Sequence, residues 1–428
     1  MINCLGEEGA DKDSMSSRVK LQFNRYDYSA FITFFAYASS SVIVPVALIQ
    51  IASALGFPLS EGGMGAGGAL QISRTISMTT LMVVSGFISA KLGLRKSLGL
   101  AAFFMGIGCL AVSLANSYWF LFAAILCAGC GEGYIEAMAT PFVQKLHKEN
   151  TGQYMNFAHS FWSIGVTGTT IGAGFMLMCG VPWRPVVFCT CLLAVAAGLS
   201  LLWPEKKGYE FPEEHETLSL GTVLKQTKDI WSTPKFWLFF LLMFVAGGAE
   251  YCLTFWLASF MQLTMKTGAF LGGLATAVFS IGMVTGRMGW GVYVPQKRLG
   301  QSLIVACTIG LLLSCAIPFV RPEMAVGRVG GIILLFVLLY LIGITIAPLW
   351  PTIQTYSVDR LPKHLDETMV FVWLSCAGVP GCGTFAWLMG VLGDVFHSLN
   401  VPFFLVPACQ LILAVALLVE TRKNVNES

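Results

Sequence analysis

Apolar stretches long enough to cross a bilayer dominate the sequence. Each holds roughly 20 residues or more, the length that a helix needs to span the hydrocarbon core of a membrane. Only 11% of the residues are charged, whereas soluble domains carry about 25%. The sequence therefore predicts an all-α integral membrane protein with twelve transmembrane helices. The stretches lie at residues 27–55, 68–90, 97–117, 119–142, 152–179, 183–203, 234–263, 268–294, 299–320, 328–357, 366–393 and 400–420.

A polar segment divides these stretches into two sets of six. We expect residues 27–203 and 234–421 to form two pseudo-symmetric six-helix bundles, joined by a cytoplasmic linker at residues 204–233. Residues 1–26 and 422–428 are expected to be cytoplasmic tails. The first of them lacks the apolar core and the cleavage site of a secretory signal peptide.

The distribution of basic residues predicts the orientation in the membrane. Short cytoplasmic loops carry an excess of Lys and Arg, so both termini and the linker are expected in the cytoplasm. The short loops suit a cell inner membrane, where we expect a monomer embedded in lipid, with no nucleic-acid partner. The predicted cytoplasmic side receives the N-terminal tail, the linker lysines, Lys91, Arg95, Lys96, Lys145, Lys148, Lys297, Arg298, Arg360, Lys363, Arg422 and Lys423, and the other side receives Arg184, Lys266, Arg321 and Arg328.

The loop between the second and third apolar stretches resembles a known signature. The run Gly86-Phe-Ile-Ser-Ala90-Lys91-Leu-Gly93-Leu-Arg95-Lys96 is similar to the G-x-L-A-D-R-x-G-R-R signature of the major facilitator superfamily. Its glycine and basic positions match, and Ala90 stands at the acidic position. The resemblance implies the major facilitator fold, a gating role for Gly86, Lys91, Gly93, Arg95 and Lys96, and a substrate site between the two halves.

Further motifs resemble the fucose:proton symporter branch of that superfamily. They are Glu132-Gly-Tyr-Ile-Glu136 followed by Thr-Pro-Phe-Val, Asn156-Phe-Ala-His159-Ser-Phe-Trp162, Gly248-Ala-Glu250 with Trp256, Trp350-Pro351, and Gly390-x-x-Gly-Asp394. The resemblance implies symport of a sugar with a proton. Two departures argue against fucose itself: the first apolar stretch has Ser39, Ser40 and Ser41 where the branch has an aspartate, and Trp162 replaces an asparagine.

Three carboxylates within the apolar stretches are candidates for proton coupling. A charge in mid-bilayer is costly, so such residues usually face the protein interior and bear on function. Glu132 and Glu136 are one helical turn apart on the same face, and two adjacent carboxylates do not both ionise cheaply. Glu250 is the third candidate. For each, the alternative is a structural carboxylate that bonds a neighbouring helix.

A histidine and two arginines complete the ionisable set. His159 is expected at the same depth as Glu136 and is a candidate proton relay, with side-chain packing as the alternative. Arg74 lies deep in its stretch and must pair either with a carboxylate or with an anionic substrate. Arg287 lies near the cytoplasmic end of its stretch, where it can snorkel or bond backbone carbonyls, and we interpret it as structural.

Aromatic and amide side chains are candidates for sugar binding, because rings cover the apolar face of a sugar while amides bond its hydroxyls. Trp350 and Gln354 share one face at a spacing of four residues. Each tryptophan has an alternative role in helix packing or at the membrane interface. The candidates are Asn156, Trp162, Trp256, Trp350, Gln354 and Trp373.

The sequence thus predicts a proton-coupled symporter of a sugar or a similar small polar metabolite, with sodium open as the coupling ion. One alternative is an organic anion carrier that uses Arg74, and another is a membrane sensor that does not transport. Gly168-Thr-Thr-Ile-Gly172 lacks the proline of drug antiporters, which favours a symporter or facilitator. No catalytic motif, cofactor or metal cluster is predicted, since Cys127-x-x-Cys130 has no second ligand pair.

Overall fold

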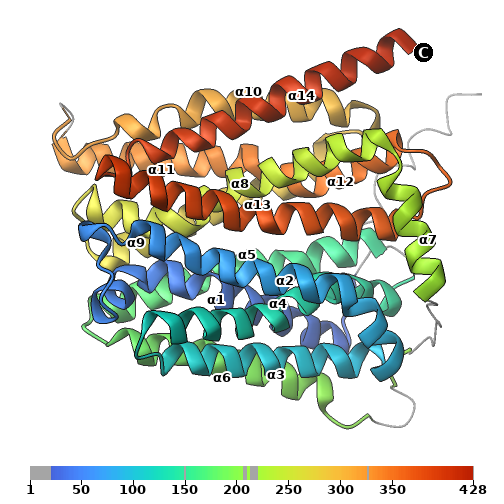
Figure 1. Ribbon diagram of the computed structural model, residues 1–428, viewed down its shortest axis with the longest axis horizontal. Coiled ribbons are helices and arrows are strands. Elements are labelled where there is room, and N and C mark those ends of the chain that lie inside the picture. Colours follow the sequence, from blue (N-terminus) through green and yellow to red (C-terminus); the bar gives the residue numbers. More distant parts are fainter. Residues whose placement is uncertain (1–20, 149–150, 206–209, 213–219, 325–326, 428) are drawn as a thin grey trace, which may run out of the picture.

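The computed structural model describes residues 21–148, 151–205, 210–212, 220–324 and 327–427, and the regular structure of these residues is entirely helical. We call α1–α6 the N-terminal half and α8–α14 the C-terminal half. Both halves are bundles of helices that run along the same axis, with the N-terminal half in blue to green and the C-terminal half in yellow to red (Figure 1). The helices are α1 (Arg25–Ala54), α2 (Met64–Leu92), α3 (Leu94–Ser113), α4 (Tyr118–Leu146), α5 (Thr151–Met178), α6 (Trp183–Leu202), α7 (Leu220–Trp231), α8 (Pro234–Leu263), α9 (Ala269–Tyr293), α10 (Leu299–Ser314), α11 (Gly327–Ile346), α12 (Leu349–Arg360), α13 (Glu367–Phe396) and α14 (Leu405–Glu427), with 3-10 turns at Leu59–Glu61, Gln296–Arg298, Ile317–Phe319 and Pro402–Phe404.

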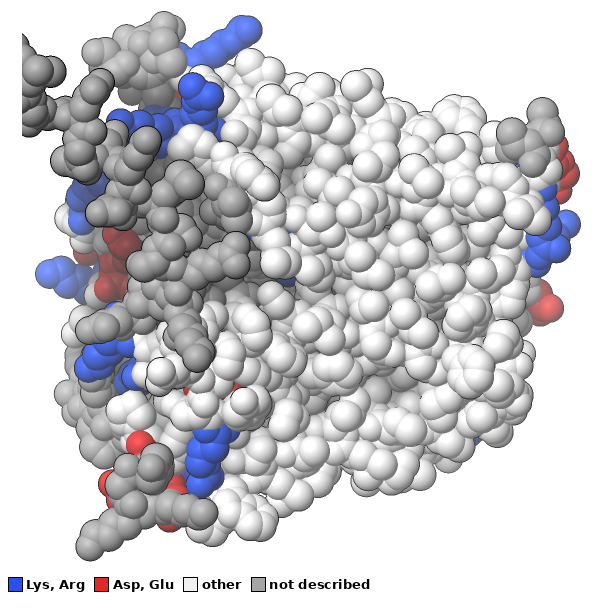
Figure 2. All heavy atoms as spheres, turned by 180° about the vertical axis from the view of Figure 1, so that it is seen from behind, with Lys and Arg blue, Asp and Glu red and all other residues white. Residues whose placement is uncertain are grey.

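Within the described part of the chain, twelve helical segments are long and apolar enough to cross a membrane, α11 and α12 together forming one of them (Gly327–Arg360). This confirms the predicted fold class. A white band without surface charge separates two charged ends (Figure 2). We call the end that carries Lys91, Lys96, Lys145 and Arg360 the basic end, and the end that carries Arg184 and Lys266 the opposite end.

Local sequence sets the ends of several helices. Asn24 and Asp27 form a capping box at the start of α1: the Asn24 side chain accepts hydrogen bonds from the backbone of Tyr26 and Asp27, and the Asp27 carboxylate accepts one from Asn24 at 2.7 Å. Such a cap satisfies backbone donors that a helix start leaves open. Gly93 has φ of +80° and separates α2 from α3 without a further loop, a conformation that glycine adopts at little cost.

The predicted linker contains a helix that the sequence analysis did not predict, α7. The Thr227 hydroxyl of α7 accepts a hydrogen bond from Trp373 Nε1 of α13 at 3.3 Å. Trp231 packs edge to face on the same Trp373 ring, with centroids 4.8 Å apart. The end of the linker therefore lies against the C-terminal half at the basic end (Figure 1).

The start of the linker is fixed to the N-terminal half by Glu205. Its carboxylate accepts hydrogen bonds from Tyr26 Oη at 3.1 Å and from the backbone of Phe211 at 3.0 Å, and it pairs with Arg95 Nε at 3.2 Å. The Phe211 N–H, with smaller contributions from Tyr26 and Arg95, holds the pKa of Glu205 below its usual value. Arg95 also donates to the Leu201 carbonyl at 2.7 Å.

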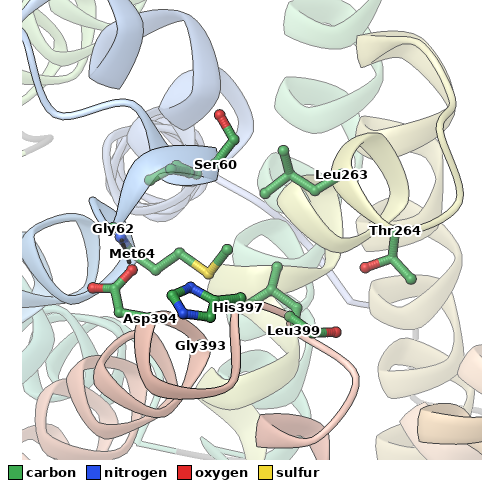
Figure 3. Close-up of a pocket in the computed structure, with 11 residues that line it drawn as sticks. Ser60, Gly62, Met64, Leu263, Thr264, Gly393, Asp394, His397 and Leu399 are labelled. Atoms are coloured by element: carbon green, nitrogen blue, oxygen red, sulfur yellow. Dashed lines mark hydrogen bonds between the residues drawn. The ribbon is translucent and has the colours of Figure 1, made fainter.

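The two halves pack closely against each other toward the opposite end. A Cβ added to Gly273 of α9 would lie 2.1 Å from the Thr170 carbonyl of α5. Asp394, near the end of α13, accepts hydrogen bonds from the first two backbone N–H groups of α2, Met64 at 2.9 Å and Gly65 at 2.7 Å. A cavity of about 250 Å³ lies beside this contact, lined in part by His397 (Figure 3). The glycine at position 273 thus allows α9 to pack closely on α5, as small residues do between membrane helices.

Candidate substrate and proton site

Three consecutive serines of α1 point in three directions, because successive residues of a helix are rotated by about 100°. Ser39 hydrogen-bonds Thr169 of α5 at 2.7 Å, and Ser41 hydrogen-bonds the Tyr251 hydroxyl of α8 at 2.9 Å. Ser40 faces α4. Ser41, in the segment of α1 that has serines instead of an aspartate, therefore forms a hydrogen bond between the two halves.

A fully buried ion pair lies behind Ser40, inside the N-terminal half. Arg74 Nη1 of α2 lies 2.7 Å and 2.9 Å from the two carboxylate oxygens of Glu132 of α4. Ser40 Oγ donates to Glu132 at 2.5 Å, and the Ser40 carbonyl accepts from Arg74 at 3.1 Å. The two side chains are 3% and 0% exposed. The structure thus pairs Arg74 with a carboxylate of its own half, one of the two partners that the sequence left open.

A second charged cluster lies between the halves. The Arg287 Nη2 of α9 is 4.0 Å from Glu250 Oε2 of α8, and its guanidinium carbon is 5.8 Å from the centre of the Trp162 ring of α5. Glu136 of α4 lies near both Arg287 and Glu250 and near the Tyr37 hydroxyl of α1. Two carboxylates, one from each half, therefore share one described cation.

Arg287 is the residue of this cluster that the sequence analysis missed. The sequence predicts a structural side chain that snorkels or bonds backbone carbonyls, and the structure shows a carbonyl bond: Nε donates to the Ala347 carbonyl at 3.3 Å, just after α11 ends. The predicted stretch 328–357 is broken there into α11 and α12. Pro348 lies in the break and Pro351 in the first turn of α12, and a proline inside a helix removes one backbone hydrogen bond.

The structure places the His159 ring against Thr140 and Phe34. Its Nε2 lies 2.9 Å from Thr140 Oγ1, one turn along α4 from Glu136, and its ring packs on Phe34. The depth of His159 was estimated from the rise along its helix, which gives no information on the direction of the ring. Asn156 lies in α5, and its side chain lies outside the described residues.

The remaining aromatic candidates occupy different depths. Trp256 is fully buried in the C-terminal half and donates to the Ala386 carbonyl at 2.8 Å. Trp350 is partly exposed and lies over Gly378 of α13. Gln354 donates to Ser375 Oγ at 2.9 Å. Trp373 lies under α7. Trp350 and Gln354 thus remain candidates, whereas Trp256 packs helices together.

The signature loop joins α2 to α3 at the basic end, and its predicted gating role stays a prediction. Gly93 forms the turn between α2 and α3, and Gly86 lies within α2. Lys91 and Lys96 are exposed. Arg95 is buried and bonds the end of α6 and Glu205. With Ala90 at the acidic position, the arginine finds its carboxylate in the linker. Among the described residues, no group of His, Cys, Asp or Glu side chains is placed to hold a metal ion.

Comparison with known proteins identifies the family. The sequence profile of the Major Facilitator Superfamily matches residues 29–384, which is most of the chain. The protein therefore belongs to this superfamily of membrane transporters, and it is a transporter rather than an enzyme. No curated protein sequence matches the chain.

Solved structures with the same fold include several solute transporters. A mutant of the nucleoside transporter NupG is 12% identical, with a TM-score of 0.74 over 92% of this chain and 99% of NupG. A D-xylose-proton symporter is 13% identical, with a TM-score of 0.72 over 92% and 96%. A mutant of the E. coli fucose:proton symporter FucP is 16% identical, with a TM-score of 0.62 over 92% and 98%. Identities this low show the fold alone.

Proposed function

We propose that the protein carries a sugar or a similar small polar metabolite together with a proton, by exposing a site between its two halves alternately to each side of the membrane. One observation carries the proposal: Glu136 and Glu250, from opposite halves, lie around Arg287, the one cation that the described residues place between them. Sugar–proton symporters among the structures of the same fold agree with it.

The charges of the cluster favour proton binding. With both carboxylates ionised, the cluster of Glu136, Glu250 and Arg287 holds one uncompensated negative charge in a membrane interior, where such a charge is costly. Uptake of one proton balances it. A proton on either carboxylate also frees Arg287 from one partner, so that the guanidinium donates instead to an oxygen of the substrate beside Trp162.

The orientation follows from the basic end. We propose that this end, with Lys91, Lys96, Lys145 and Arg360, faces the cytoplasm, because cytoplasmic loops carry the basic excess. Both termini would then be cytoplasmic. A monomer in a cell inner membrane satisfies this arrangement.

An organic anion is the second candidate substrate, with Arg287 rather than Arg74 as its counter-ion. Arg74 already has Glu132 at hydrogen-bonding distance. Among the described residues, the hydrogen bond of Arg287 uses Nε alone, and Glu250 is 4.0 Å from Nη2. The two terminal nitrogens of Arg287 are thus available to a substrate carboxylate, which guanidinium binds in bidentate geometry.

The test uses proteoliposomes and records external pH and tracer uptake while xylose, fucose, uridine or glucuronate is added outside. Proton symport makes the outside alkaline when the right solute is added. We expect this signal to be lost in Glu136→Gln and Glu250→Gln and kept in Glu61→Gln, a matched change of an exposed carboxylate. Saturable tracer uptake without proton movement would contradict proton coupling, and binding without uptake would contradict transport.

A further inference from the structure

Two prolines free two backbone carbonyls at the break between α11 and α12. In a continuous helix the N–H of residue i bonds the carbonyl of residue i−4. Pro348 and Pro351 have no N–H, so the carbonyls of Ile344 and Ala347 lose their helical donors. In a membrane an unsatisfied carbonyl costs several kcal/mol, and each of the two therefore needs another environment.

The two freed carbonyls meet different neighbours on α9. The Ala347 carbonyl accepts the Nε hydrogen bond of Arg287 at 3.3 Å. The Ile344 carbonyl lies against Gly286, where an added Cβ would approach it to 2.6 Å. Consecutive residues of α9 thus contact the two carbonyls, one through a charged side chain and the other through a glycine backbone.

We infer that Pro351 is a positioning residue for Arg287: by leaving the Ala347 carbonyl without a helical donor, it holds the guanidinium through Nε between Glu250 and Trp162, with both terminal nitrogens directed to the ligand. The inference concerns the site of the proposed function, but its first test needs no substrate. Pro348 is the matched control, because it bends the same helix and frees a carbonyl that Arg287 does not contact.

The physical reason lies in the geometry of guanidinium. It has five donors in one rigid plane, so a hydrogen bond at Nε fixes the direction of the other four. An alanine at position 351 supplies an N–H that competes for the Ala347 carbonyl. Arg287 then keeps its charge and its helix position but loses the contact that orients it.

The first arm measures the melting temperature of the purified full-length protein in detergent. Arg287→Ala is introduced into three backgrounds: wild type, Pro348→Ala and Pro351→Ala. In the first two, the truncation leaves the Ala347 carbonyl unsatisfied, whereas in the third the new N–H satisfies it. We expect the loss in melting temperature to be clearly smaller in the Pro351→Ala background than in the other two. Equal losses in all three backgrounds would overturn the inference.

The second arm measures uptake kinetics with whichever of xylose, fucose, uridine or glucuronate the wild type carries. Pro351→Ala should raise KM about tenfold, which corresponds to ~1.4 kcal/mol, with little change in maximal rate, and Pro348→Ala should leave KM unchanged. An equal rise in both variants would assign the effect to the bend alone and refute the positioning role. If the wild type carries none of the four, the proposed function fails for this panel, and the melting comparison still decides the role of Pro351.

Discussion

Replacement of Arg74 by methionine tests whether the buried pair with Glu132 is structural. At a separation near 2.8 Å and an effective dielectric constant of 20, the pair attracts with about 6 kcal/mol, most of which offsets desolvation. Removing one partner leaves the other charge buried, which costs about 3–5 kcal/mol. The two side chains are 3% and 0% exposed, so this cost for a buried ion pair applies to them. We expect Arg74→Met to lower the free energy of unfolding, measured by SDS titration in mixed micelles, by about that amount.

The double variant Arg74→Met with Glu132→Leu is the control. It removes both charges, and replacing a buried pair by apolar side chains of similar volume is often neutral or stabilising. We expect its free energy of unfolding to lie within about 1 kcal/mol of the wild-type value and its uptake per folded molecule to be unchanged. A single variant as stable as the wild type would refute the energetic reasoning. A stable double variant without uptake would return Arg74 to the substrate site.

Three further predictions concern the contacts that fix the halves and the linker. Asp394→Ala removes the acceptor for two backbone donors of α2. The contact between α2 and α13 should loosen, so maleimide should label a cysteine placed at the buried position of Thr75 faster. At neutral pH the wild type should have a higher melting temperature than Glu205→Gln. This difference should vanish as the pH falls through the pKa of Glu205, which lies below its ordinary value of 4.5. Gly273→Ala, whose Cβ would meet a carbonyl of α5 at 2.1 Å, should reduce uptake, whereas Gly172→Ala, with nothing within 4 Å, should not.

The topology could be predicted because it depends on local properties of the chain. The length and apolarity of each stretch are set residue by residue, and twelve spans follow from counting them. Two features of the fold needed more than this count. The helix α7 is amphipathic and only 12 residues long, so its polar residues made it resemble a loop. The break at Pro348 was visible in the sequence, but the apolar stretch around it continues without interruption.

The candidate site was less predictable because it depends on which helix faces meet. Glu136 and Glu250 were found from their cost in a bilayer, which needs no neighbour. His159 was placed at the depth of Glu136, yet its ring bonds Thr140, because helix rotation and not rise decides its partner. For Arg287 the sequence predicts a side chain that snorkels or bonds carbonyls, but only the packing of α9 decides that it reaches the Ala347 carbonyl after α11.

The two arginines differ in how they respond to movement between the halves. Arg74 and Glu132 both belong to the N-terminal half, so a rocking motion carries them together and leaves their 2.7 Å contact intact. Arg287 and Glu250 belong to the C-terminal half, whereas Glu136 and Trp162 belong to the N-terminal half. Rocking therefore changes the distance from Arg287 to Glu136 but not the distance to Glu250. In the mechanism that we propose, a proton on Glu136 would remove the attraction between Arg287 and the N-terminal half and would thus couple protonation to the separation of the halves.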